Sequence, residues 1–159
     1  MQNKGAVGVV ALDEVERVVL IKQYRHPVSR VLWELPAGLR DVGGEDMVAT
    51  AARELAEETD LRAGRFDLLI DLYTSPGFSN EMIRLFLARD LTPVREEERF
   101  ARTDEEADLE IAWFDLDEAV AMVMRGEITN AAAVGGLLSA ARARDDGWAT
   151  LRPPATPEP

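Results

Sequence analysis

The sequence predicts an α/β (α+β) fold in which a mixed β-sheet lies between helices, as an α/β/α sandwich. Two observations lead to this prediction. Runs rich in β-branched and aromatic residues recur along most of the chain, which indicates a sheet of several strands. Apolar residues at helical spacing are confined to one early segment and to the C-terminal part, so an early helix and a helical C-terminus would cover the sheet.

Three strands and one helix are expected in the first part of the chain. The runs 6–12 and 17–23 flank the short polar stretch DEVE, which predicts a β-hairpin, and VLWEL at 31–35 is a third strand. The glycine-containing stretch AGLRDVGGED is expected to be a loop. Apolar residues then recur at helical spacing over 47–59, where Asp46 or Glu45 can serve the helix start.

The second half of the chain is expected to contain three strands and two helices. The strands lie at 65–75, 81–91 and 109–116, with the turn PGFSN between the first two and a charged loop at 92–108. The helices are one that Asp115 or Asp117 caps and that runs to about Arg125, and one over 127–144 that begins near Thr129 or Asn130. These elements predict one domain over residues 1–148, followed by a disordered tail over 149–159.

Composition excludes several classes of function. The chain has 159 residues, no cysteine and a net charge of -12. Without cysteine there is no disulfide scaffold and no thiol catalysis, and such an acidic surface repels phosphate backbones, so a nucleic-acid partner is not expected. No apolar run is long enough for a membrane span and no secretory signal is visible, so we expect a cytoplasmic protein without a membrane partner.

Carboxylates crowd the segment RELAEE. On a helix over 47–59, Glu54, Glu57 and Glu58 occupy neighbouring positions of one face, where like charges destabilise the helix by a few tenths of a kcal/mol per pair, roughly. One interpretation is a solvated helix face held by salt links, with Arg53 beside the glutamates. The other is a cage for a divalent cation, because Mg²⁺ prefers hard oxygen ligands.

The segment from Gly38 to Leu61 resembles the Nudix box, whose pattern is G-x5-E-x7-R-E-U-x-E-E-x-G-U, with U a bulky aliphatic residue. Glu45 takes the place of the first glutamate, and Arg53, Glu54, Glu57 and Glu58 follow at the spacing of the pattern. Two departures are visible. Gly38 lies one residue too far from Glu45, and Asp60 stands where the pattern has glycine. Aspartate tolerates the left-handed conformation better than most residues, so the second departure is mild.

The resemblance to the Nudix hydrolase family implies a Nudix-type α/β/α sandwich and a set of metal ligands. Glu54, Glu57 and Glu58, with the carbonyl of Ala37, would bind two or three Mg²⁺ or Mn²⁺ ions, and Glu54 and Glu58 would count as catalytic. Arg53 and Glu45 would mainly hold the loop and helix together. The family cleaves a nucleoside diphosphate linked to another group, through attack of a metal-activated water on phosphorus.

Stretches outside the box, QYRHPV, WELPAG, TSPGFSNE and RGEITNAAAVGGL, resemble the ADP-ribose pyrophosphatase branch, which has a proline about fifteen residues beyond the box. Pro76 is fifteen residues after Leu61. The resemblance implies that Arg25 contacts substrate phosphate, although a surface ion pair is the alternative for this residue. It also implies that Ser75 and Glu81 contact the terminal ribose and that Leu39 contacts substrate through its backbone.

This branch carries a general base on a late loop, which corresponds here to TDEEADLEIAWF. Glu105 is the first choice and Glu106 the alternative. The resemblance covers about residues 5–140, and the additional N-terminal segment that usually precedes this domain and exchanges between subunits has no counterpart in the chain. A homodimer is nevertheless the oligomer expected from the branch.

The expected activity is therefore Mg²⁺-dependent hydrolysis of a small-molecule nucleoside diphosphate, with ADP-ribose giving AMP and ribose 5-phosphate. Two alternatives remain open. One is hydrolysis of another nucleotide sugar, such as GDP-mannose. The other is a non-catalytic, Nudix-like nucleotide-binding module, against which the intact Glu54, Glu57 and Glu58 speak.

Overall fold

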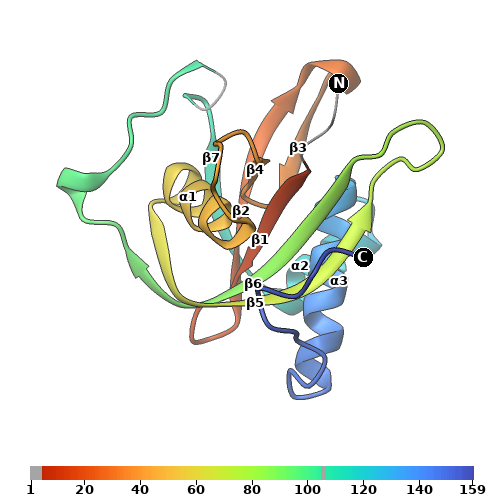
Figure 1. Cartoon of the computed structure of the whole chain (residues 1–159). Coiled ribbons are helices and arrows are strands. Elements are labelled where there is room, and N and C mark those ends of the chain that lie inside the picture. Colours follow the sequence, from red (N-terminus) through yellow and green to blue (C-terminus); the bar gives the residue numbers. More distant parts are fainter. Residues whose placement is uncertain (1–4, 105–106) are drawn as a thin grey trace.

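A computed structural model describes residues 5–104 and 107–159 of the chain. It contains seven strands and three α-helices within these residues (Figure 1). The strands are β1 (Ala6–Ala11), β2 (Arg17–Arg25), β3 (Arg30–Glu34), β4 (Ala37–Leu39), β5 (Leu61–Tyr73), β6 (Met82–Pro93) and β7 (Glu110–Asp115). The helices are α1 (Met47–Thr59), α2 (Leu116–Met124) and α3 (Ala131–Asp145), and two short 3-10 turns lie at His26–Val28 and Glu96–Glu98.

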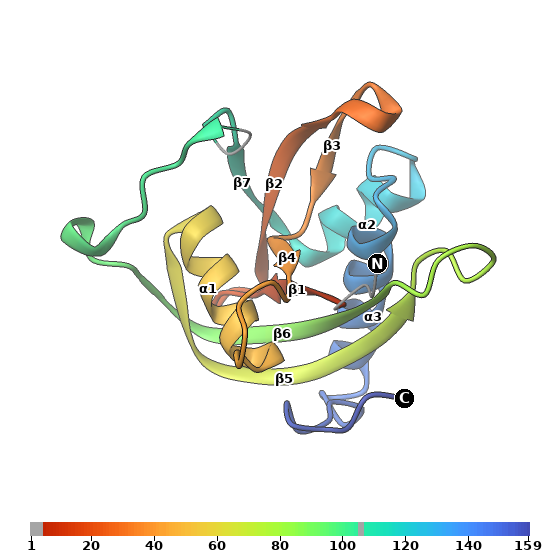
Figure 2. The same cartoon turned by 45° about the horizontal axis from the view of Figure 1, so that its top comes forward.

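The strands form two sheets. The larger sheet has the order β4-β1-β6-β5, in which β1 runs parallel to β6 and the other neighbours are antiparallel. The smaller sheet has the order β3-β2-β7 and is antiparallel throughout. Figure 2 shows the smaller sheet rising at an angle from the larger one, with α1 on the side facing the viewer. The mixed sheet and the α/β class predicted from the sequence are thus present.

Apolar clusters lie on both faces of the larger sheet, because successive residues of a strand point to opposite faces. Every residue of β1 is buried. Val9 of β1 and Phe86 of β6 pack against Leu55 of α1. Val10 and the neighbouring residues of β6 contribute to the cluster that α2 and α3 cover on the opposite face. The sheet therefore lies between helices, as a sandwich.

The expected hairpin of the first two strands is largely absent. The polar turn between them forms, because the Asp13 amide donates to the Arg17 carbonyl at 3.0 Å and Leu12 bridges Val18. Beyond that point the strands diverge, since β1 is paired on both edges by β4 and β6 while β2 is paired on both edges by β3 and β7. Long-range pairing therefore replaces the local hairpin. It also turns the glycine-containing stretch 37–39, expected to be a loop, into β4.

Side-chain caps begin α1 and α3 at positions that were predicted from the sequence. The Asp46 carboxylate accepts the Ala49 amide at 2.7 Å and begins α1, and the Asn130 side chain accepts the Ala133 amide at 3.0 Å and begins α3. Asp115 precedes α2 without a side-chain cap bond. Among the helices of the described residues, none is long and apolar enough to cross a membrane.

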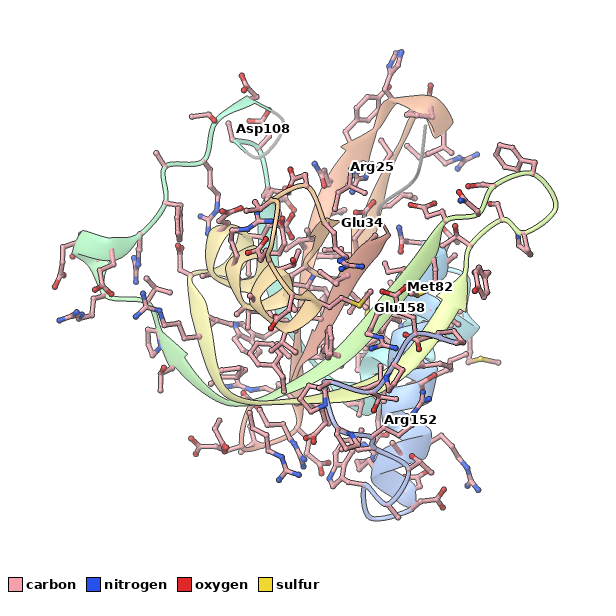
Figure 3. The ribbon with its side chains drawn as sticks, in the orientation of Figure 1. Arg25, Glu34, Met82, Asp108, Arg152 and Glu158 are labelled. Atoms are coloured by element: carbon pink, nitrogen blue, oxygen red, sulfur yellow. The ribbon has the colours of Figure 1, made fainter. Side chains whose placement is uncertain are left out.

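The C-terminal segment 149–159, expected to be a disordered tail, lies along the larger sheet and contacts it. Arg152 exchanges two backbone hydrogen bonds with Leu68 at the edge of β5, at 2.8 and 3.1 Å. The buried Arg84 of β6 donates to the Thr156 carbonyl at 2.5 Å and to the Pro157 carbonyl at 3.1 Å. Figure 3 shows the segment crossing the larger sheet from Arg152 to Glu158. Its backbone carbonyls satisfy a buried arginine, which the composition of the segment alone does not reveal.

Candidate active site

The candidate site lies where β4 meets the face of α1. The Glu58 side chain accepts a hydrogen bond from the Ala37 amide at 3.1 Å, and Glu58 is only 6% exposed. Because Ala37 is the first residue of β4, this bond ties the last turn of the helix to the strand. The Ala37 carbonyl, which the sequence assigned to the metal site, therefore belongs to a residue that contacts one of the three glutamates.

Gly38 makes room for a second glutamate. A Cβ atom added at Gly38 would overlap the carboxylate of Glu54, which is itself buried. Glycine is thus required here by close approach of a side chain and not by a positive φ angle. The Glu54 carboxylate lies directly against the β4 backbone, in a space that any other residue at position 38 would fill.

Arg53 connects the helix to the preceding loop. Its guanidinium donates to both carboxylate oxygens of Glu45 at 3.1 and 3.2 Å, to Glu54 at 2.9 Å and to Glu57 at 3.5 Å. It also reaches Asp41 at 3.3 Å. The hydrogen bonds to Glu45, followed by the nearby charges of Glu54 and Glu57, raise the pKa of Arg53 above its ordinary value. This arginine is therefore a permanent cation among carboxylates.

The donor set around α1 suits a hard divalent cation. Within residues 5–104 and 107–159 no three acidic or histidine side chains converge closely enough to hold a metal by themselves. Glu54 and Glu57 instead lie against Arg53, while Glu58 accepts the Ala37 amide. Carboxylate oxygens from one helix face, beside the β4 backbone and the space left by Gly38, are nonetheless the ligand chemistry that Mg²⁺ and Mn²⁺ take. The residues fit the implied metals in the kind of ligand atom that they offer.

A cavity of about 440 Å³ lies beside β4. It brings together residues from β2, β3, β4, the β5–β6 turn and the start of α3. Of the residues that the sequence assigned to substrate or metal, Arg25, Ala37, Leu39 and Glu81 line it. Ser75 does not line it; the Ser75 carbonyl accepts the Phe78 and Ser79 amides inside the turn.

Two residues that sequence reasoning did not select also line this cavity. Glu34 accepts two hydrogen bonds from the guanidinium of Arg25, at 2.8 and 2.6 Å (Figure 3). Thr74 donates its hydroxyl to Glu81 at 2.9 Å. The side chain of Glu34 is 4% exposed and that of Arg25 is 44% exposed, so the ion pair has a buried and an accessible end. The signal for Glu34 was present, because a carboxylate inside the apolar run VLWEL needs a cationic partner.

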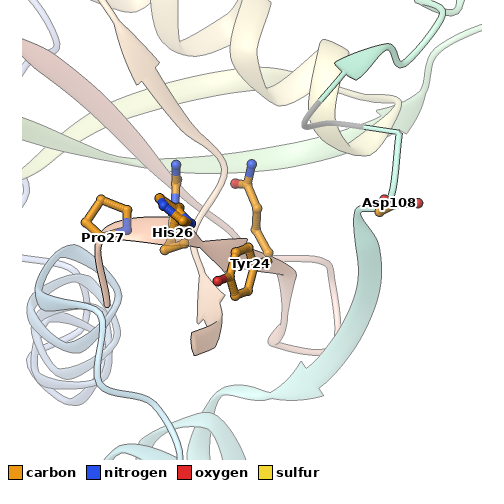
Figure 4. A pocket seen from close by; sticks show the side chains of 6 residues that line it. Tyr24, His26, Pro27 and Asp108 are labelled. Carbon is orange, nitrogen blue, oxygen red and sulfur yellow. The ribbon is translucent and has the colours of Figure 1, made fainter. Parts of the chain in front are cut away.

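A second, smaller cavity of about 280 Å³ shares Arg25 with the first. It is lined by Gln23, Tyr24, His26, Pro27 and, from the opposite side, Asp108 (Figure 4). Asp108 belongs to the acidic loop that precedes β7. The two candidate bases, Glu105 and Glu106, lie outside the described residues. The described end of their loop nevertheless faces Arg25 across this cavity.

Comparison with known proteins gives a consistent result. The family model described as NUDIX domain matches residues 2–133. The chain is 46% identical over 153 residues to the ADP-ribose pyrophosphatase of Mycobacterium tuberculosis, covering 96% of this chain and 72% of that protein. It is 37% identical over 131 residues to the ADP-ribose pyrophosphatase of Bacillus subtilis, covering 82% and 69% of the two chains. The fold resembles the crystal structure of an ADP compounds hydrolase, with a TM-score of 0.77 and 23% identity over 90% of this chain and 74% of that one.

Proposed function

The chain belongs to the Nudix family, and from this premise we propose that it is a hydrolase that splits ADP-ribose into AMP and ribose 5-phosphate. The observation that carries the proposal is the position of the α1 glutamates beside β4, next to a cavity that Arg25 lines. The M. tuberculosis and B. subtilis relatives support ADP-ribose as the substrate.

The proposed metal ligands are Glu54, Glu57, Glu58 and the Ala37 carbonyl. Nudix hydrolases generally use divalent metal ions, and here these residues would hold two or three Mg²⁺ or Mn²⁺ ions. When bound, the ions supply charge neutralisation at the diphosphate and a water of lowered pKa. Arg53 holds two of these glutamates and Glu45 fixes Arg53, so both residues support the ligands without reaching substrate.

Arg25 is the proposed phosphate-binding residue. Its planar guanidinium matches the geometry of phosphate oxygens and stays charged at every physiological pH. Glu34 fixes the guanidinium through two hydrogen bonds, so the orientation of Arg25 is set before substrate arrives. The surface ion pair considered as an alternative therefore exists, yet Arg25 lies at the wall of the cavity.

Ser75 and Glu81 are the proposed contacts to the terminal ribose, and Leu39 is the proposed contact to substrate through its backbone. Thr74 fixes the Glu81 carboxylate by its hydroxyl. The proposed base is Glu105, with Glu106 as the alternative. It would accept a proton from the attacking water while the water oxygen bonds to phosphorus and the bridging P–O bond to the leaving phosphoryl group breaks. The neighbouring Asp108 lies across a cavity from Arg25, which supports the loop as the source of the base.

We further propose a homodimer, as expected from the branch, and a location in the cytoplasm. The alternatives from the sequence, hydrolysis of GDP-mannose and nucleotide binding without turnover, make different predictions for one experiment. Purified protein with Mg²⁺ is incubated with ADP-ribose, NADH, GDP-mannose and diadenosine polyphosphates, and phosphatase-sensitive product is measured. We expect the highest kcat/KM with ADP-ribose. A preference for GDP-mannose would contradict ADP-ribose as the substrate and favour GDP-mannose. Absence of hydrolysis of every compound in the panel would contradict the proposal that the protein is a hydrolase.

Gly38→Ala is expected to lower kcat about 10- to 100-fold with little change in stability. The added Cβ would displace the Glu54 carboxylate, and a displacement of about 1 Å at a catalytic group can cost about 100-fold in rate. The flexible end of Glu54 can move aside, so the fold is expected to persist. Steady-state kinetics and a thermal melt of the two proteins measure the two effects.

Gly43→Ala is the matched control for this variant. Nothing lies within 4 Å of a Cβ atom placed at Gly43, and its φ angle is not positive, so the substitution is expected to leave kcat unchanged. Equal kinetics of Gly38→Ala and wild type would contradict the placement of Glu54 in the site.

A further inference from the structure

Asp60 occupies an unusual backbone position at the end of α1. Its φ and ψ angles are 56° and 35°, in the left-handed region, and its amide closes the helix by donating to the Ala56 carbonyl at 3.0 Å. The Nudix pattern has glycine here, which adopts this conformation without a steric penalty. A residue with a side chain costs roughly 1 kcal/mol more in this region, less for aspartate than for most residues, and an interaction of its carboxylate can offset this cost.

The compensating interaction is with Arg102. One guanidinium nitrogen of Arg102 donates to the Asp60 carboxylate at 2.8 Å and to the Glu58 carbonyl at 3.2 Å. The side chain of Arg102 is 25% exposed and that of Asp60 is 21% exposed, so solvent screens this ion pair less than a surface pair. A cation at a helix C-terminus also suits the negative end of the helix dipole. The residue that replaces glycine thus holds an arginine 42 positions later in the chain.

Arg102 belongs to the long segment between β6 and β7. The first half of this segment contacts Asp60 and the start of β5. The Val94 amide donates to the Asp60 carbonyl at 2.8 Å, and Glu98 pairs with Arg62 of β5 at 3.1 Å. Arg102 continues the same attachment, and in the described part of the chain it is the last long-range tie before residues 105–106. Those two residues are the proposed bases.

We propose that Asp60 and Arg102 form a positioning pair that sets the register between the base-bearing segment and the metal-bearing helix. The pair joins the segment three residues before Glu105 to the turn of α1 that contains Glu57 and Glu58. Neither member contacts substrate; they act through the residues that they hold. The inference rests on the proposed function, because it assigns the pair to the step in which water loses its proton.

Asp60→Gly separates the two roles of this residue. Glycine keeps or improves the left-handed helix end and removes only the carboxylate. We expect kcat for ADP-ribose to fall about tenfold, with KM within about twofold and the melting temperature unchanged or higher. Arg102→Gln should lower kcat by the same factor, and the double variant should be no slower than either single variant. Arg102→Lys, which keeps the charge, should retain most of the activity.

Hydrogen exchange provides a measurement that does not depend on turnover. Amides in peptides covering residues 95–104 should exchange faster in Asp60→Gly and in Arg102→Gln than in wild type. Arg99→Gln is the control, because within the described residues the Arg99 side chain donates only to the Val94 carbonyl at 3.4 Å, inside the same segment. It should change neither exchange nor kcat.

The outcomes distinguish the pair from the proposed function. Faster exchange in both variants of an otherwise inactive protein would support the attachment and overturn the catalytic role assigned to it. An active wild type whose Asp60→Gly variant shows unchanged kcat and unchanged exchange would overturn the positioning pair. Multiplicative loss in the double variant would also overturn it, because residues that act through one contact do not add.

Discussion

Glu58→Gln is expected to lower kcat by about three orders of magnitude, equivalent to about 4 kcal/mol of transition-state stabilisation, while the fold is retained. Glutamine has the same shape, and its amide oxygen can still accept the Ala37 amide. The charge that would hold a divalent cation is lost, however. Steady-state kinetics with saturating Mg²⁺ measure the loss, and titration with Mn²⁺ should show weaker metal binding in the variant.

Glu58→Gln is expected to affect stability in a different direction from activity. Glu58 is buried and lies one helical turn from Glu54, so in metal-free buffer the neutral side chain relieves repulsion between like charges. The variant should therefore melt at the same or a higher temperature than wild type without metal, and should gain less from added Mg²⁺. Glu118→Gln on α2, whose partner Arg125 is exposed, is the control and should change neither property. Near-normal kcat for Glu58→Gln would remove Glu58 from the metal site.

Arg84→Met is expected to destabilise the protein by about 3–5 kcal/mol, which for a chain of this size lowers the melting temperature by roughly 10 °C. Arg84 donates two hydrogen bonds to Asp71 at 2.7 and 2.8 Å, and the two side chains are 3% and 10% exposed. Hydrogen bonding by Asp71 raises the pKa of Arg84, so Arg84 stays a cation. Removing the arginine leaves a buried carboxylate without its cation and releases the carbonyls of Thr156 and Pro157.

Two further variants test this explanation by thermal denaturation. Arg84→Met combined with Asp71→Leu removes both charges, and it should recover much of the lost stability because an apolar pair of similar volume can replace a buried ion pair. Arg125→Met breaks an exposed pair with Glu118 and should leave the melting temperature unchanged. If the double variant were as unstable as Arg84→Met alone, the unpaired Asp71 would not be the cause.

Local features of this chain were predictable, and long-range ones were not. The bounds of α1 and the caps at Asp46 and Asn130 follow from residues within one helical turn, where periodicity and capping preferences act. β4 was missed because Ala37 and Gly38 have little strand preference, and only their pairing with Gly8 and Val7 makes them a strand. The hairpin of β1 and β2 was predicted wrongly for a similar reason. The local sequence indicates a turn after β1, but it does not indicate which strands pair with β1 and β2.

The same division applies to the candidate site. The spacing of Glu54, Glu57 and Glu58 predicts that they share one helix face, because helical periodicity alone decides which residues of a helix are neighbours. The contacts of Arg25 with Glu34 and of Asp60 with Arg102 join segments distant in sequence, and no local pattern reveals such a partner. The contact of the C-terminal segment with the sheet is another case, because its partner Arg84 lies inside β6.

The parallel pairing of β1 with β6 has a bearing on how the chain is synthesised. Ala6 pairs with Ile83 and Ala11 with Ala88, so the central strand acquires this neighbour only after most of the sequence has left the ribosome. At about 5–20 residues per second, translation of the intervening residues takes roughly 4–16 s. Throughout that interval the apolar stretch AVGVVA, which is fully buried in the finished sheet, is not yet covered by β6. The nascent chain therefore exposes this apolar stretch until β6 has been synthesised.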